Sequence, residues 1–335
     1  HLTLVYQATK ICSNMSIEAI ARRLVAPGKG VLAADESTPT IGKRFERYSI
    51  PNTEGNRGSY RDLLFTTPGI EPFISGVILF DETFRQKGLD GTLFTDLLTA
   101  RGIAPGIKVD QGTEVFGKKG EKRTKGLEGL DERLAEYVRL GAQFTKWRGV
   151  ITIGDGSAGS PQGGIPTDDC LRENAKSLAQ FALKTQNAGM VPIVEPEVLM
   201  DGDHSIGRCF DVTNRTLQFV FEELKAAGVN LKGMLLKPNM ILAGADSITP
   251  STTEEVARKT LECFMGVVPK DVPGIVFLSG GQSDEDAAKN LNEMNKGAEK
   301  PWELSFSFGR GLQSAALNAL AGQLDDSTHR AAAQK

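Results

Sequence analysis

Histidine and cysteine are both scarce in this chain of 335 residues. The three histidines, His1, His204 and His329, lie far apart in the sequence, so a zinc site built on histidine is not expected. The four cysteines show no CxxC spacing, which is typical of reduced thiols and not of a disulfide framework. The sequence therefore argues against a zinc site built on histidine or cysteine.

Long apolar runs and a strong excess of charge are also missing. No stretch reaches transmembrane length, and residues 1–14 lack the apolar core and basic start of a signal peptide. The chain has 39 Lys and Arg against 42 Asp and Glu, which gives a net charge of −3 and argues against nucleic acid or an anionic membrane as the main partner. We therefore expect no membrane span and no nucleic-acid partner.

Short runs rich in Val, Ile, Leu and Phe recur along the chain, and helical segments with start or stop signals separate most of them. The runs cover residues 30–35, 74–80, 105–110, 144–151, 190–199, 232–240, 274–281 and 303–311. A capping box is predicted at Ser251–Glu254, and the helix over 210–228 should stop at Gly228. Eight strands alternating with helices predict an α/β fold, a (β/α)8 TIM barrel, as a single domain over 1–335.

Charged residues stand where the apolar pattern of these runs stops. The clearest case is Met234-Leu235-Leu236-Lys237, because a buried lysine loses its proton more readily and its free amine can attack a carbonyl carbon. Three other runs carry charged pairs two residues apart, so both members face the same way. The pairs are Lys108 with Asp110, Lys146 with Arg148, and Glu195 with Glu197. In a barrel these ends form the active face.

Glycine-containing turns follow the last two runs, LSGGQS and SFGRG. In barrels the loops after strands seven and eight commonly form a phosphate site from backbone N–H groups, and Arg310 adds a guanidinium suited to phosphate. A second anion site is predicted beside Asp35, in ADESTPTIGKR. Its candidate residues are Ser37, Thr40, Lys43 and Arg44, with Lys108 helping. Two anion sites on opposite sides of Lys237 indicate a substrate with a phosphate at each end.

Two other segments are interpreted as loops. The run over 118–125 is interpreted as a solvated loop. Residues 154–159 match GxGxxG, yet Pro161 and Pro166 follow, so the helix that a dinucleotide site needs cannot start there.

Taken in order, LAADES, GIKVD, FTKWR, VPIVEPE, LLKPNM, FLSGGQS and SFGR closely resemble the class I fructose-1,6-bisphosphate aldolases, from Ile17 to Leu320. The resemblance implies reversible cleavage of fructose 1,6-bisphosphate to dihydroxyacetone phosphate and glyceraldehyde 3-phosphate through a lysine imine, in glycolysis, gluconeogenesis or photosynthesis. It implies that Lys237 forms the imine, that Glu195 is the general acid and base, and that Glu197 supports the lysine.

Further roles come from the same resemblance. Asp35 is implied in proton transfer at the C4 hydroxyl, and Lys146 and Arg148 stand beside the reacting centre. The C1-phosphate site would comprise Ser279, Gly280 and Arg310, with Gly281 and Gly309 as further phosphate-binding candidates, and the C6-phosphate region Ser37, Thr40, Lys43, Arg44 and Lys108.

The chain departs from the family pattern at three places. The stretch after WRGVITIG is longer than expected, Pro39 and Thr40 replace smaller residues, and the family's C-terminal tail with its tyrosine has no counterpart. The resemblance implies a homotetramer in the cytoplasm, with the plastid as an alternative. Acidic peptides or actin-like filaments are possible secondary partners. Two other readings stay open: another lysine-imine barrel, such as a transaldolase or a deoxyribose-phosphate aldolase, and a scaffold without catalysis.

Overall fold

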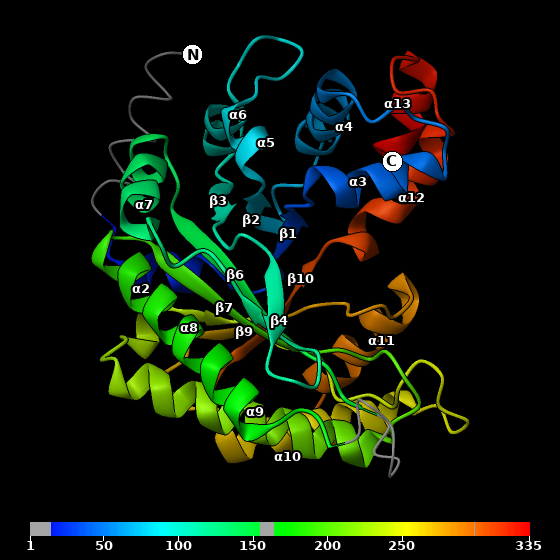
Figure 1. The fold of residues 1–335 in the computed structure, drawn as a ribbon. Helices are drawn as coiled ribbons and strands as arrows, with labels where there is room; N and C mark the ends of the chain where they lie inside the picture. Colours follow the sequence, from blue (N-terminus) through cyan, green and yellow to red (C-terminus); the bar gives the residue numbers. More distant parts are fainter. Residues whose placement is uncertain (1–14, 155–163, 298) are drawn as a thin grey trace.

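A computed structural model describes residues 15–154, 164–297 and 299–335. Its centre is a closed barrel of eight parallel strands with helices around it (Figure 1). The strands are β1 (Gly30–Ala34), β2 (Ile74–Leu79), β3 (Ala104–Lys108), β6 (Phe144–Ile151), β7 (Val191–Val198), β8 (Leu235–Leu236), β9 (Gly274–Phe277) and β10 (Glu303–Phe308). All eight predicted strands are therefore present, and the (β/α)8 barrel is confirmed.

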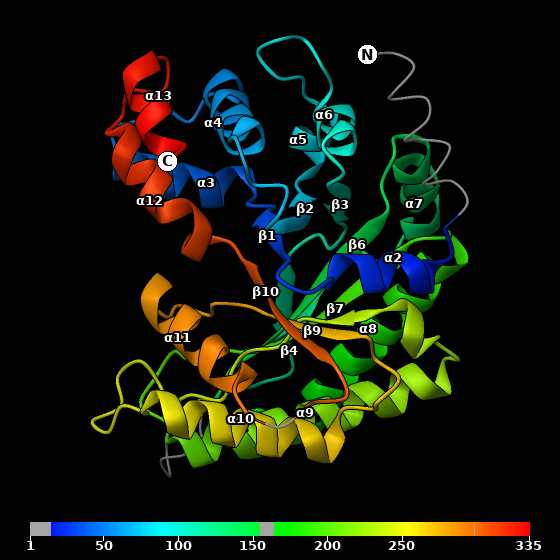
Figure 2. The same ribbon diagram turned by 180° about the vertical axis from the view of Figure 1, so that it is seen from behind.

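Helices surround the strands on the outside of the barrel, and the first of them lies at mid-height in Figure 2, beside β6 and β7. Their bounds are α2 (Ile17–Leu24), α3 (Thr38–Glu46), α4 (Glu54–Thr66), α5 (Asp81–Arg85), α6 (Phe94–Ala100), α7 (Leu130–Arg139), α8 (Asp168–Asn187), α9 (Ile206–Ala226), α10 (Thr253–Val267), α11 (Asp284–Asn295), α12 (Arg310–Leu320) and α13 (Ser327–Ala333), with a 3-10 turn η1 (Leu231–Gly233). Among the helices of the described residues, none has both the length and the apolar character needed to cross a membrane.

Apolar side chains fill the barrel interior on the side away from the C-terminal ends of the strands, and they pack against α2. Strand alternation selects every second residue for this inner cluster. Its buried members are Ile20, Ala21, Leu24, Val25, Val31, Ala33, Ile78, Ala104, Phe144, Val191, Ile193, Leu235 and Val276. Gly106 makes room for the Phe144 ring, because a Cβ at this glycine would lie 2.2 Å from the ring. The same alternation, continued upward, places the charged strand ends on the interior face.

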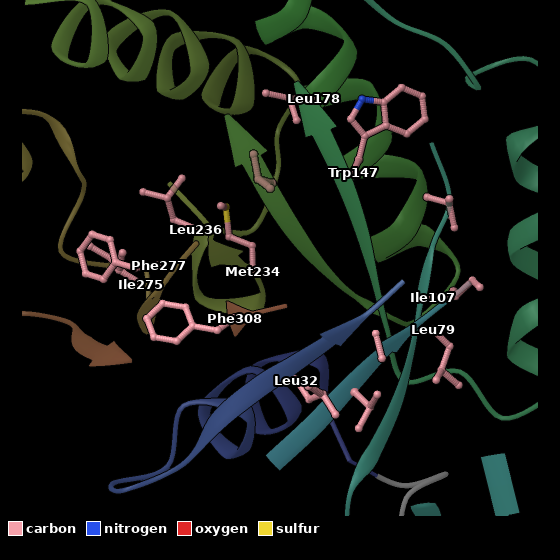
Figure 3. Close-up of a cluster of buried hydrophobic side chains, with 14 of the residues drawn as sticks. Leu32, Leu79, Ile107, Trp147, Leu178, Met234, Leu236, Ile275, Phe277 and Phe308 are labelled. Atoms are coloured by element: carbon pink, nitrogen blue, oxygen red, sulfur yellow. The ribbon is translucent and has the colours of Figure 1, made fainter. Parts of the chain in front are cut away.

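A larger outer cluster joins the opposite faces of the strands to the surrounding helices. Figure 3 shows side chains of this cluster on several strands, among them Leu32, Ile107, Trp147 and Phe277. The Trp147 ring stacks on Phe181 of α8, with 5.6 Å between ring centroids. This packing fixes the strand ends from outside, where the site residues begin.

An antiparallel hairpin, β4 (Thr113–Phe116) with β5 (Glu121–Thr124), is inserted between β3 and β6. Interpreting 118–125 as a solvated loop was wrong over 121–124, because Glu121 and Thr124 are buried. The Glu121 carboxylate accepts hydrogen bonds from the backbone N–H and the hydroxyl of Thr167, both at 2.7 Å. The hairpin is thereby attached to the start of α8.

Two helix-boundary predictions have different outcomes. The capping box is one residue later than predicted: Thr252 is the N-cap of α10, and its hydroxyl accepts from the N–H of Glu255. Ser251 instead accepts a hydrogen bond from the N–H of Ala243. The predicted stop at Gly228 is confirmed, since α9 ends at Ala226 and Gly228 has a φ of +77°. Residues 155–159 of the GxGxxG match lie outside the described residues.

Candidate active site

A cavity of about 1050 Å³ opens at the C-terminal ends of the barrel strands. Its walls come from all sides of the mouth, so residues far apart in sequence meet there. Most of the predicted site residues line it: Asp35, Ser37, Thr40, Arg44, Lys108, Lys146, Arg148, Glu195, Glu197, Lys237, Ser279, Gly280, Gly309 and Arg310. Lys43 and Gly281 are not among the lining residues.

Four of these side chains form one continuous chain of ion pairs. Lys237 Nζ lies 3.1 Å from Glu195 Oε1, and Lys146 Nζ lies 2.9 Å from Glu195 Oε2. The same Lys146 ammonium lies 2.9 Å from Asp35 Oδ2. Lys146, Glu195 and Lys237 are each at most 4% exposed as residues. Glu195 is thus held between two lysines, and Lys146 between two carboxylates.

The pairing decides the protonation of these groups. Burial alone would raise the pKa of Asp35, but the nearby charges of Lys146, Lys237 and Lys108 lower it below its ordinary range. Burial opposes ionisation of Glu195 in the same way, and Lys146, Lys237 and Arg148 outweigh it and lower its pKa. Burial would lower the pKa of Lys146, whereas Asp35, Glu195 and Asp110 raise it. At neutral pH the site therefore holds two carboxylates around one ammonium.

Two further ion pairs surround this centre. Arg148 Nε donates to Glu197, and the carboxylates of Glu197, Glu195 and Asp110 overcome the effect of burial and raise the pKa of Arg148. On β3, Lys108 Nζ lies 2.7 Å from Asp110 Oδ1 and donates to the Asp110 carbonyl at 2.8 Å. The members of each predicted charged pair do point to the same interior.

The loops after β9 and β10 supply a wall made largely of backbone. Gly280 and Gly281 have φ values of +59° and +98°, a left-handed conformation that glycine adopts without steric cost. A Cβ on Gly281 would lie 3.7 Å from a guanidinium nitrogen of Arg310, so this glycine borders Arg310 although it does not line the cavity. Arg310 is the first residue of α12, and Gly309 is the N-cap. Backbone N–H groups and a guanidinium therefore meet at one anion-binding wall.

The neighbouring wall, after β1, is the start of α3. Ser37 is the N-cap of α3, and its hydroxyl lies 3.0 Å from that of Thr40. Arg44 reaches the cavity from the last turn of the helix. Lys43 is exposed outside the cavity. The structure thus brings together the predicted second anion site with the exception of Lys43.

Sequence reasoning missed Glu36, which neighbours Asp35 in the same loop. Its side chain is 6% exposed and pairs with Arg44 and, at 2.6 Å, with Arg61. It also accepts a hydrogen bond at 3.0 Å from Gln313 of α12. A second carboxylate after the strand was the only signal, and it did not show which arginines would approach it.

Within the described ranges, no three His, Cys, Asp or Glu side chains are arranged to hold a metal ion. Cys170, Cys209 and Cys263 are buried free thiols, and burial raises the pKa of Cys170 and Cys263 to about 12. Cys12 lies outside the described residues. The charged side chains that line the cavity are those of lysine, arginine, aspartate and glutamate.

Comparison with known proteins gives consistent results. The sequence profile of the family described as "Fructose-bisphosphate aldolase class-I" matches residues 16–335. A probable fructose-bisphosphate aldolase class 1 of Xanthomonas campestris pv. campestris is 50% identical over 307 residues, which is 90% of each chain. Fructose-bisphosphate aldolase 1 of Toxoplasma gondii is 51% identical over 303 residues, covering 90% of this chain and 82% of that protein.

A solved structure is similar over nearly the whole length. It is fructose-bisphosphate aldolase from Plasmodium falciparum in complex with TRAP and a small-molecule inhibitor. The TM-score is 0.90 at 47% identity, and the match covers 95% of this chain and 89% of that one. The cytosolic fructose-bisphosphate aldolase 5 of Arabidopsis thaliana is 50% identical over 309 residues, covering 91% of this chain and 84% of that protein.

Proposed function

This chain belongs to the class I fructose-bisphosphate aldolase family, and on that premise we propose how its own residues carry out the reaction. The enzyme is a lyase that reversibly cleaves fructose 1,6-bisphosphate to dihydroxyacetone phosphate and glyceraldehyde 3-phosphate through a lysine imine. The other lysine-imine barrels and the non-catalytic scaffold are therefore set aside. The residue roles below are our proposal.

Lys237 forms the imine, with Glu195 as its proton partner. At 3.1 Å, the ammonium proton of Lys237 can pass to the Glu195 carboxylate, which leaves a free amine to attack the C2 carbonyl carbon. Glu195 then returns that proton to the leaving oxygen, and the second proton of the water comes from the amine. One water and one protonated imine result. Glu197, paired with Arg148, keeps this end of β7 charged and oriented.

Carbon–carbon cleavage needs a base for the C4 hydroxyl. Asp35 accepts that proton, the C3–C4 bond breaks, and its electron pair passes into the C2 imine to give an enamine. Lys146 lies within 2.9 Å of both Asp35 and Glu195, so its charge stabilises the two carboxylates between proton transfers. The enamine is later protonated at C3, and water releases dihydroxyacetone phosphate.

The two anion-binding walls orient the substrate. The C1 phosphate is assigned to Ser279, Gly280, Gly281, Gly309 and Arg310, and the C6 phosphate to Ser37, Thr40, Lys43, Arg44 and Lys108. Lys43, which is exposed, acts here through its charge and not by contact. In the proposed binding mode, C2 lies over Lys237 and C4 beside Asp35.

The observation that carries the proposal is the Lys237–Glu195–Lys146–Asp35 chain of ion pairs at the barrel mouth. Borohydride reduction in the presence of dihydroxyacetone phosphate should add the mass of a reduced triose phosphate to the peptide that contains Lys237. Lys184, whose amine pairs with Asp131 on the surface, serves as the internal control. A label on Lys146 or Lys108 would contradict the assignment of Lys237.

Class I members use a lysine imine and no metal, and we propose that this chain likewise needs no cofactor. Among the described residues, no three His, Cys, Asp or Glu side chains are arranged to hold a metal ion, which is compatible with this proposal. Labelling repeated after prolonged chelation should give the same yield at the same rate. Loss of labelling that added zinc restores would overturn metal independence.

Assembly, location and partners are also proposals. We propose one barrel domain over 1–335, a homotetramer, and a cytoplasmic location with the plastid as the alternative; relatives named cytosolic support the location. Light scattering tests the homotetramer, and cell fractionation tests the location.

The solved relative was crystallised with TRAP, and the basic cavity mouth here supports secondary binding of acidic peptides or actin-like filaments. Competition of such a peptide with fructose bisphosphate tests this.

A further inference from the structure

The lysine assigned to the imine stands beyond the end of a very short strand. β8 comprises Leu235 and Leu236, and its register with β7 comprises the pairs Ile193 with Leu235 and Val194 with Leu236. The backbone N–H of Lys237 donates to the Val194 carbonyl at 2.8 Å, which is the next bond along this edge. Further along, Glu195 and Glu197 belong to β7, whereas the chain after Lys237 has left the strand.

One buried side chain connects the two segments at that point. Asn239 lies two residues after Lys237 and is 4% exposed. Its Oδ1 accepts a hydrogen bond from the backbone N–H of Val198, the last residue of β7, at 3.0 Å. Its Nδ2 donates to Thr213 Oγ1 of α9 at 3.1 Å and to the carbonyl of Met240 at 3.0 Å. The amide therefore links the loop of Lys237 to the strand of Glu195 and to the helix behind them.

The Asn239 amide bonds the Lys237 loop to β7 beyond the last backbone hydrogen bond between β7 and β8. Val198 follows Glu195 by three residues on the same strand, so a bond that fixes Val198 also fixes the carboxylate's end of β7. Proton transfer between Lys237 and Glu195 needs the two groups within hydrogen-bond reach, and a shift of about 1 Å can cost a hundredfold in rate. No atom of Asn239 lies among the residues that line the cavity.

We propose that Asn239 is a positioning residue, which holds Lys237 within proton-transfer distance of Glu195 by bonding the N–H of Val198. This inference rests on the proposed function of Lys237. Unlike a cavity residue, Asn239 acts on the covalent step and leaves the phosphate-binding walls in place.

Two variants of the same buried cluster separate positioning from mere stability. Asn239→Ala removes the bond to Val198. Thr213→Val removes a bond of the same amide and is nearly isosteric, but it leaves the Asn239–Val198 bond in place. Both should lower the melting temperature. The rate of borohydride-trapped imine formation should fall by about tenfold to a hundredfold in Asn239→Ala and by less than about threefold in Thr213→Val.

A binding measurement completes the test. Hexitol 1,6-bisphosphate carries both phosphates and no ketone, so its inhibition constant reports the two walls without the covalent step. In Asn239→Ala it should stay within about twofold of wild type while kcat falls. Imine formation at the wild-type rate in Asn239→Ala, or equal slowing in Thr213→Val, overturns the proposal.

If Asn239→Ala does not fold, Asn239→Asp replaces it, because the carboxyl keeps an oxygen that can accept from Val198. Its imine rate should lie within about threefold of wild type, and a larger loss counts against the proposal. The wild-type label is mapped first. A label outside Lys237 removes the proposed function itself, whereas a label on Lys237 with unchanged Asn239→Ala removes only the positioning role.

Discussion

At the scale of single residues, Lys146 is the cation that pairs with two carboxylates of the site. It is 5% exposed at its side chain and lies 2.9 Å from each of two carboxylates, Asp35 and Glu195. Without this cation both carboxylates would remain in a low-dielectric interior with less compensation. We therefore expect the same contacts to support the stability of the fold and the proposed catalytic role of Lys146.

Lys146→Met should lower the free energy of unfolding at pH 7 by about 3 to 5 kcal/mol, the usual result of leaving buried charges unpaired. Lys184→Met, which removes the partly exposed pair with Asp131, should cost about 1 kcal/mol or less. Denaturant unfolding of both variants measures the difference. Equal losses would mean that the buried pairs contribute no more than a surface pair.

The loss of unfolding free energy in Lys146→Met should depend on pH. The folded pKa values of Asp35 and Glu195 are lowered, so their ionisation contributes stability that is present above the ordinary carboxyl values and lost as the pH falls through the folded values. Lys146→Met removes the main charge that lowers them. The gap between wild type and variant should therefore be widest near pH 7 and narrow below about pH 4. A constant gap would contradict the ion-pair explanation.

The residues of this centre could be predicted, but their pairing could not. Alternation along strands placed Lys108, Lys146, Glu195 and Lys237 on the interior because charged residues ended apolar runs. Two features depend on the distances between strands and loops, which only the closed barrel sets. One is the pairing of Lys146 with Glu195, and the other is the burial of Glu36 between Arg44 and Arg61.

At the scale of elements, the hairpin β4–β5 is the part that the sequence pattern concealed. Four lysines and an arginine in 118–125 predict solvation, yet the two ends of β5 are buried. The cause is tertiary: Glu121 meets the first residues of α8, which lie more than forty positions later. The eight barrel strands were predictable because their own composition makes them apolar.

Glu121→Ala should lower the free energy of unfolding by about 1.5 to 3 kcal/mol, because the N–H and hydroxyl of Thr167 lose a charged acceptor. Glu114→Ala, on the partner strand and in an exposed pair with Arg123, should cost about 1 kcal/mol or less. Thermal unfolding followed by circular dichroism compares the two. Equal stability of both variants would show that the hairpin does not support α8.

At the scale of the whole molecule, the two walls proposed to bind phosphate follow β10 and β1, which are neighbouring strands of the barrel. Arg310 begins α12 after the last strand, and Arg44 closes α3 after the first. These elements are adjacent in Figure 1, although nearly the whole chain separates them. Residues from both ends of the sequence therefore line the same cavity.

Arg310→Ala should reduce kcat/KM for fructose bisphosphate by about tenfold to over a hundredfold, since a charged hydrogen bond contributes about 1.5 to 3 kcal/mol. Inhibition by dihydroxyacetone phosphate, which keeps the C1 phosphate, should weaken more than inhibition by glyceraldehyde 3-phosphate. Arg258→Ala, on the outer surface of α10, is the control. Equal weakening of both trioses would assign Arg310 to the whole mouth and not to one phosphate.

The pairing of β1 with β10 also governs how the chain is made. β1 is the first strand to leave the ribosome, and its second barrel neighbour, β10, is the last. Until residue 308 is synthesised, β1 has one unpaired edge and the mouth has only one of the two walls proposed to bind phosphate. The nascent protein thus carries an open sheet edge through most of its synthesis. The barrel closes and the cavity gains its last wall in the same final step.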